Sequence, residues 1–223
     1  MPCRPELTRR DAVRNSERIL EAATAVFARL GLDASLDEVA REAGVGVATV
    51  YRRFADKEAL IDALFETKIG AIVALAEEGL AHPDAWQGVC HFILGAAAQL
   101  AADRGLMHVV VSAAHGRIGT ERARKRIGPV VAKLVSRGIN AGAVRPEVTA
   151  TDFPMVQILL AAVIDASREV RPGLWKRYAS LFLDAIRADG MPRVALEEPA
   201  LAMIDVDVVM RCWQPGRRSI SES

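Results

Sequence analysis

Residues 35–59, SLDEVAREAGVGVATVYRRFADKEA, decide the fold of this chain, because they encode two short helices joined by a tight turn. Ser35 and Glu38 have the S-x-x-E spacing of a capping box, in which each side chain satisfies a backbone N–H group at a helix start. Apolar residues at helical spacing follow this cap, and Gly44 then ends the helix because glycine readily adopts a left-handed conformation. The predicted buried face of this helix consists of Leu36, Val39, Ala40 and Ala43.

A second short helix is predicted over residues 47–54, after the additional backbone freedom of Gly46. Its apolar residues Val50 and Phe54 lie four positions apart and can face inward together. The side chains between them, which carry hydroxyl and guanidinium groups, then point elsewhere. Two helices joined by a short glycine-bearing turn are typical of the helix-turn-helix of DNA-binding proteins, whose second helix enters the major groove.

The same stretch resembles the signature of TetR-type transcriptional regulators, over residues 14–65. In that family an alanine-glycine-valine turn precedes a recognition helix with an aromatic residue and a final phenylalanine, and a lysine-glutamate pair opens the next helix. The residues that carry the resemblance are Ala43, Gly44, Val45, Thr49, Tyr51, Phe54, Lys57 and Glu58. The chain departs from the pattern at Gly46, where the family often has a serine cap, and at Arg53, where histidine is common.

The resemblance implies an all-α protein with an N-terminal three-helix helix-turn-helix DNA-binding domain and a C-terminal helical ligand-binding and dimerisation domain. Beyond residue 65 only this architecture is shared. The expected organisation has four parts. They are a flexible basic arm over residues 1–11, the helix-turn-helix domain over 12–56, the effector-binding and dimerisation domain over 57–192, and a tail over 193–223 with a short helix at 201–213.

The candidate DNA contacts lie on the second short helix and at the start of the next one. Hydroxyl groups can donate to phosphate oxygens, and arginine can reach phosphates or a guanine edge. A lysine at a helix N-terminus also favours phosphate, because the backbone N–H groups and the dipole point the same way. The resemblance implies that Val47, Thr49, Arg52 and Arg53 face the groove and that Tyr51 and Lys57 contact the DNA backbone. The alternative is that Tyr51 only packs and that the arginines are solvated.

Composition and cysteine spacing indicate where the protein is found and which kinds of chemistry to expect of it. The 223 residues have a net charge of +1, so any DNA-binding surface must be local. The cysteines Cys3, Cys90 and Cys212 have neither a zinc spacing nor the pattern of a disulfide framework, which favours a reducing cytoplasm. We see no signal peptide and no apolar run long enough to span a membrane. The absence of a catalytic motif predicts a protein that is not an enzyme and has no cofactor or metal.

Apolar periodicity places further helices on either side of the decisive stretch. The first covers residues 12–30, buries Phe27, and leaves Arg14 and Arg18 toward solvent or phosphate. A long helix from residue 57 runs toward Gly79 and connects the two domains. The remaining predicted helices cover residues 86–102, 106–115, 120–141 with a kink at Gly128-Pro129, 152–170 and 174–188.

The last two long helices carry more apolar surface than one domain needs, which predicts a homodimer through a four-helix bundle. The residues of this face are Val156, Leu159, Leu160, Val163, Tyr178, Leu181, Phe182 and Ile186. Polar or soft residues within apolar helices are candidates for an effector pocket. They are Trp86, Cys90, His91, Met107, His108, His115, Gln157 and Asp165. Each can also be an ordinary core or surface residue, and a histidine-based metal site is the remaining alternative.

These observations predict a dimeric regulator, most simply a repressor that a small-molecule effector releases from a palindromic operator in double-stranded DNA. The alternative is a helical small-molecule or metal sensor, or an enzyme, that keeps the three-helix module only as packing. The two hypotheses differ at residues 47–53, which are exposed in a DNA-binding protein and buried in the alternative.

Overall fold

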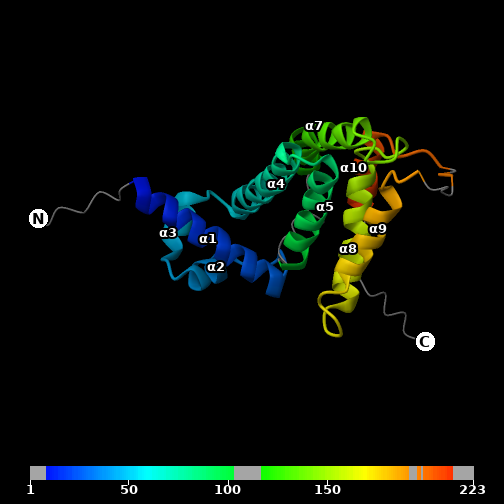
Figure 1. Ribbon diagram of the computed structural model, residues 1–223. Coiled ribbons are helices and arrows are strands. Elements are labelled where there is room, and N and C mark those ends of the chain that lie inside the picture. The colour runs from blue at the N-terminus through cyan, green and yellow to red at the C-terminus, as the bar shows by residue number, and fades with distance from the viewer. Residues whose placement is uncertain (1–8, 103–116, 191–194, 197, 213–223) are drawn as a thin grey trace, which may run out of the picture. The chain divides into compact units, whose positions relative to one another are not determined.

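The computed structural model describes residues 9–102, 117–190, 195–196 and 198–212, and these residues form an all-α fold, as predicted (Figure 1). The helices are α1 (Arg9–Leu30), α2 (Leu36–Ala43), α3 (Val47–Arg53), α4 (Lys57–Ala81), α5 (Ala85–Ala102), α7 (Arg117–Asn140), α8 (Asp152–Ser167), α9 (Trp175–Ile186) and α10 (Met203–Cys212). Extended pairing in the described part is limited to one isolated antiparallel bridge between Val144 and Arg187. None of the described helices has the length and apolarity needed to cross a membrane.

Most predicted helices are present, with shifted ends. Helix α1 begins at Arg9, so Arg9 and Arg10 are helical and do not belong to a flexible arm. Helix α8 ends at Ser167, earlier than residue 170, and the backbone N–H of Arg171 then donates to the carbonyl of Ser167. The short helix of the tail is present as α10, whereas the helix predicted over residues 106–115 lies outside the described residues.

The chain divides into two compact units, and the division falls within α4, after Thr67. We expected the second domain to begin at residue 57, but the first part of α4 belongs to the first unit and buries Leu60 and Leu64. In this unit α1 packs on α2, and α2 packs on α3. Phe27, Val39 and Val50 are fully buried, so the predicted core of the helix-turn-helix is confirmed.

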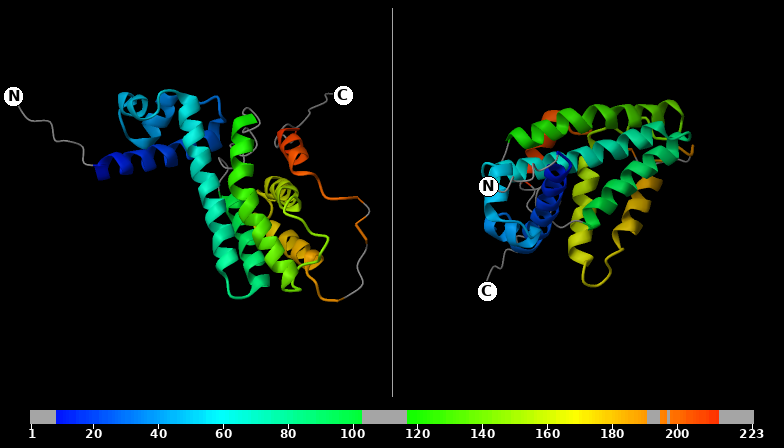
Figure 2. Two further views of the ribbon diagram at one scale, coloured as in Figure 1. Left: turned by 90° about the horizontal axis from the view of Figure 1, so that it is seen from above. Right: turned by 90° about the vertical axis from the view of Figure 1, so that its left-hand side faces the viewer.

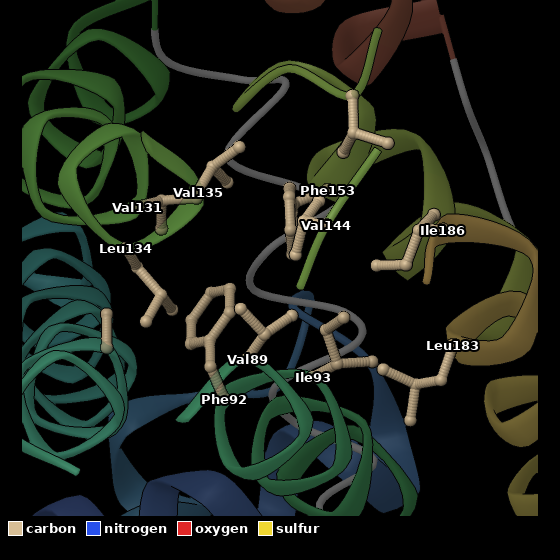
Figure 3. Packing of buried hydrophobic residues seen from close by; sticks show 12 residues of the cluster. Val89, Phe92, Ile93, Val131, Leu134, Val135, Val144, Phe153, Leu183 and Ile186 are labelled. Carbon is tan, nitrogen blue, oxygen red and sulfur yellow. The ribbon is translucent and has the colours of Figure 1, made fainter. Parts of the chain in front are cut away.

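The second unit is organised around α5, which contacts α7, α8 and α9. Side chains from these helices converge on one apolar cluster, as Figure 3 shows for Val89 and Phe92 of α5, Leu134 of α7 and Phe153 of α8. The rings of Phe92 and Phe153 are 5.7 Å apart between centroids, which fixes where α5 and α8 meet. Helices α8 and α9 pack on each other and lie side by side in Figure 1, and Figure 2 shows the same helices from two further directions.

Two glycines allow α4 and α5 to approach at backbone distance. A Cβ atom at Gly79 would lie 2.5 Å from the carbonyl oxygen of Gly88, and one at Gly88 would lie even closer to the carbonyl oxygen of Gly79. Neither position has room for a side chain, because real Cβ atoms do not approach backbone oxygens so closely. The contact therefore requires glycine on both helices.

The C-terminal end of α4 is also held by Arg137 of α7. Its Nη1 donates to the carbonyl oxygen of Leu80 at 2.9 Å and, at 3.4 Å, to that of Gly79. Its Nη2 donates to the carbonyl oxygens of Pro83, at 3.0 Å, and of His82. These carbonyls lie at and beyond the end of a helix, where most backbone partners are missing, although Gly79 O also accepts the backbone N–H of His82; one guanidinium thus binds several acceptors at once.

Candidate nucleic-acid interface

The capping box predicted at the start of α2 is confirmed. The backbone N–H of Glu38 donates to Ser35 Oγ at 3.2 Å, and the backbone N–H of Ser35 donates to Glu38 Oε2 at 2.7 Å. Accepting that backbone hydrogen bond, and a second one from the Ser35 hydroxyl, lowers the pKa of the Glu38 carboxyl below its ordinary value. The cap fixes the first turn of α2 and thereby the direction in which α2 leads to the turn.

Gly44 ends α2 in the left-handed conformation, with φ of 64°, as the sequence predicts. The backbone N–H of Gly44 donates to the carbonyl of Arg41, and that of Val45 donates to the carbonyl of Ala40. Gly46 then precedes α3 in an extended conformation and supplies no side-chain cap. The missing serine therefore leaves the start of α3 supported by backbone contacts, such as Thr49 N–H to Gly46 O at 2.8 Å.

Helix α3 buries one side and presents the other. Val50 is fully buried and Phe54, directly after the helix, is also in the core. Tyr51 is 52% exposed and Val47 is 38% exposed. Arg52 and Arg53 are exposed as well, and Thr49 is partly buried. A hydroxyl, two guanidinium groups and an exposed valine therefore share the accessible surface of one short helix, which is the chemistry that reads phosphates and base edges.

The start of α4 brings a further cation next to this surface. Asp56 caps the helix, because its Oδ1 accepts a hydrogen bond from the backbone N–H of Ala59 at 2.7 Å. Lys57 is the first residue of α4 and is partly buried. Its ammonium group thus belongs to the first turn, where the unpaired N–H groups of a helix also favour an anion.

The structure also shows a contact between α1 and the end of α2 that the sequence did not predict. Arg14 and Arg18 are both exposed, as expected, and Arg18 in addition forms a hydrogen bond within the protein. Arg18 Nη2 donates to the carbonyl oxygen of Ala43, the last residue of α2, at 2.8 Å. The two residues are 25 positions apart, and no local motif signals such a pair.

The candidate effector residues within the described part of the chain differ in their surroundings, although Trp86 and Cys90 pack against the same apolar cluster. The guanidinium of Arg187 lies 5.2 Å from the centre of the Trp86 ring. Cys90 is a free thiol whose pKa is raised by burial. His91 is exposed and pairs with Glu78 at 2.9 Å, and Asp165 is exposed on α8.

Gln157 of α8 differs from these residues, because both atoms of its amide group are buried and have no hydrogen-bond partner. Met107, His108 and His115 lie outside the described residues. Within the described part of the chain, no group of three or more His, Cys, Asp or Glu side chains is arranged to hold a metal ion. Among the predicted pocket residues that the structure describes, Gln157 is therefore the one whose buried polar atoms lack a hydrogen-bond partner.

Two protein families match this chain, one in each unit. A model described as bacterial regulatory proteins of the tetR family matches residues 19–64. A model described as the C-terminal domain of SbtR-like transcriptional regulators matches residues 84–188. Together the two models cover the helix-turn-helix and most of the second unit. Both describe transcription regulators and neither describes an enzyme.

Individual relatives agree with the family models. The chain is 28% identical over 163 residues to the uncharacterized HTH-type transcriptional regulator YhgD of Bacillus subtilis (strain 168), a match that covers 69% of this chain and 85% of YhgD. A TetR transcription regulatory protein from Mycobacterium vanbaalenii has a similar structure, with a TM-score of 0.61 and 27% identity over 80% of this chain and 98% of its own. The TetR transcriptional regulator SCO0520 from Streptomyces coelicolor has a TM-score of 0.60 and 28% identity, over 78% of this chain and 99% of its own.

Proposed function

Since the chain belongs to the TetR family of transcriptional regulators, we propose that it is a repressor whose homodimer binds a palindromic operator and is released by a small-molecule effector. The observation that carries the proposal is the exposed surface of α3 between a capped α2 and a capped α4. The alternative, in which the three-helix module serves only as packing, requires that surface to be buried. Tyr51 and Val47 are exposed, and this supports DNA binding over the packing alternative.

In the proposed complex α3 lies in the major groove of the operator. Val47, Thr49, Arg52 and Arg53 face the bases, where arginine can bind a guanine edge bidentately and valine can contact a thymine methyl group. Tyr51 and Lys57 bind backbone phosphates and set the register of the helix on the duplex. The exposure of Tyr51, Arg52 and Arg53 leaves their donors accessible for these contacts.

A single α3 covers few base pairs, so specific binding needs two copies on successive half-sites. We place the dimer contact on α8 and α9. Leu159 is 65% exposed on α8, and Tyr178 and Leu181 are exposed on α9. Val156, Leu160 and Ile186, which we expected on the same face, are buried within the protomer. The proposed contact is therefore narrower than the sequence suggested and centres on the three exposed residues.

Release by an effector requires a ligand that binds one conformation of the dimer more tightly than another. We propose that the effector binds in the second unit and meets the buried amide of Gln157. Helix α4 contributes residues to both units, so its displacement can change the spacing of the two recognition helices. A coupling of about 1–3 kcal/mol between effector and operator is typical of such regulators.

Fluorescence anisotropy with a duplex from the promoter of the protein's own gene tests the DNA contacts. We expect Tyr51→Phe and Lys57→Ala each to lower affinity about tenfold, and Lys57→Ala to reduce the slope of log K against log salt by about 0.9. The matched control is Lys133→Ala, which removes an exposed cation from α7 and leaves affinity unchanged. Full affinity in the double variant of Tyr51 and Lys57 would refute the proposed backbone contacts.

A further inference from the structure

Two arginines of α1 reach neighbouring residues at the end of α2. Arg18 Nη2 donates to the carbonyl oxygen of Ala43 at 2.8 Å, and Arg29 Nη2 lies 3.1 Å from Glu42 Oε2. Arg18 and Arg29 are eleven positions apart, three turns of one helix, and thus lie on the same side of α1. Their contacts differ in kind, because Arg29 forms a surface ion pair while Arg18 binds the backbone.

The backbone of the turn explains why the contact of Arg18 matters. The N–H groups of Gly44 and Val45 satisfy the carbonyls of Arg41 and Ala40. The carbonyl of Ala43, the last of the helix, accepts its hydrogen bond from Arg18 instead. A positive charge at a helix C-terminus is also favoured by the helix dipole. Arg18, which lies on α1 outside the helix-turn-helix motif, thus donates the hydrogen bond to the last carbonyl of α2.

Helix α3 depends on this turn because it has few anchors of its own. It is seven residues long, has no side-chain cap at Gly46, and buries Val50 alone. The turn that joins it to α2 leaves little room, since a Cβ atom at Gly44 would lie 3.3 Å from Arg18 Nη2. A short, uncapped helix takes its orientation largely from the segment that precedes it.

We propose that Arg18 is a positioning residue for DNA recognition: it fixes the carbonyl of Ala43 and thereby the turn that orients α3. The inference rests on the proposed role of α3 in reading the operator. It assigns Arg18 a contact within the protein, and not a contact with a phosphate. Arg18 does not replace the missing cap at Gly46, whose partners would be N–H groups of α3; it stabilises the other side of the turn, at the carbonyl that ends α2.

The test compares Arg18→Met and Arg18→Lys with the matched control Arg29→Met. The DNA probes are a duplex selected by the wild-type protein from a random-sequence library and an unselected duplex of the same length. We expect Arg18→Met to weaken binding to the selected duplex on the order of tenfold, as befits loss of a charge-assisted hydrogen bond. The slope of log K against log salt stays unchanged, because no phosphate contact is lost. Arg18→Lys restores most of the affinity, and Arg29→Met matches the wild type.

Amide hydrogen exchange measures the same effect without DNA, which separates this inference from the proposed function. In Arg18→Met the amides of residues 44–53 exchange faster than in Arg29→Met, while the urea midpoint shows that both variants are folded. Equal exchange in the two variants would overturn the inference. A salt slope lowered by about 0.9 in Arg18→Met would overturn it as well, because it would mean that Arg18 binds a phosphate.

Discussion

The two units of this protein are built on different kinds of contact. In the first unit the ends of α2 and α4 are set by residues close in sequence, such as Ser35 with Glu38 and Asp56 with Ala59. In the second unit the end of α4 is set by Arg137, more than fifty positions away, and by a close approach of two glycine backbones. The starts of α2 and α4 are thus set by local signals, while the end of α4 in the second unit is set by distant contacts.

The units also differ in one buried polar group. Carboxylates accept backbone N–H groups in both units, Glu38 and Asp56 in the first and Asp84 and Asp152 in the second. In the second unit the amide of Gln157 is buried without a partner, a state that costs free energy. The first unit is therefore suited to hold a fixed surface toward DNA. The second unit contains a buried amide group without a hydrogen-bond partner, which is the group that we propose the effector meets.

The largest change in stability is expected when the close contact between α4 and α5 is disrupted. Gly88→Ala places a Cβ against the carbonyl of Gly79, and because neither backbone can yield easily we expect the free energy of unfolding to fall by about 3 kcal/mol. Gly70→Ala in α4 is the matched control, since its Cβ meets no atom within 4 Å. Alanine there should raise stability by about 1 kcal/mol through its helix propensity. Urea unfolding measures both, and equal results would show that the close approach is absent.

A smaller change in stability, this time an increase, is expected when Gln157 is replaced. Leucine removes the unpartnered amide while keeping the size of the side chain, so Gln157→Leu should stabilise the free protein by about 1–2 kcal/mol. If the effector binds as we propose, the same variant should no longer be released from DNA by it, because the amide group proposed to meet the effector is gone. Gln87→Leu, at an exposed position of α5, is the control and should change neither property. Destabilisation by Gln157→Leu would mean that the amide has a partner in solution.

This contrast explains how far the sequence could predict the molecule. The capping box, the left-handed Gly44 and the burial of Val50 and Phe54 all follow from spacings of three or four residues, and all are confirmed. The exposed side chains of α3 then follow from the buried ones. The sequence could therefore predict the candidate DNA contacts, because once two inward positions of a short helix are known, few of its other residues can face outward in a different arrangement.

The remaining features depend on pairs that no local pattern links. Arg18 with Ala43 and Arg137 with Leu80 join residues that only the folded chain brings together. The sequence also could not separate Gln157 from His91, because both are polar residues in apolar helices. His91 lies at the surface beside Glu78, while the amide of Gln157 is buried, and only the structure shows the difference.

The smallest expected effect is a change of stability with pH, and it tests the local capping contact between Ser35 and Glu38 in the first unit. Hydrogen bonds from Ser35 lower the pKa of Glu38 in the folded protein below its ordinary value of 4.5, so the carboxylate is stabilising above that value. Its contribution is lost as pH falls through the lower, folded pKa. Glu38→Gln cannot ionise, so its urea midpoint should lie below that of the wild type at pH 6, and the gap should close as the pH falls below 4.5 and through the lowered pKa of Glu38. In a Ser35→Ala background the gap should be smaller but still present, because the backbone N–H of residue 35 still donates to Glu38. A gap that stays constant with pH would mean that the cap does not depend on the charge.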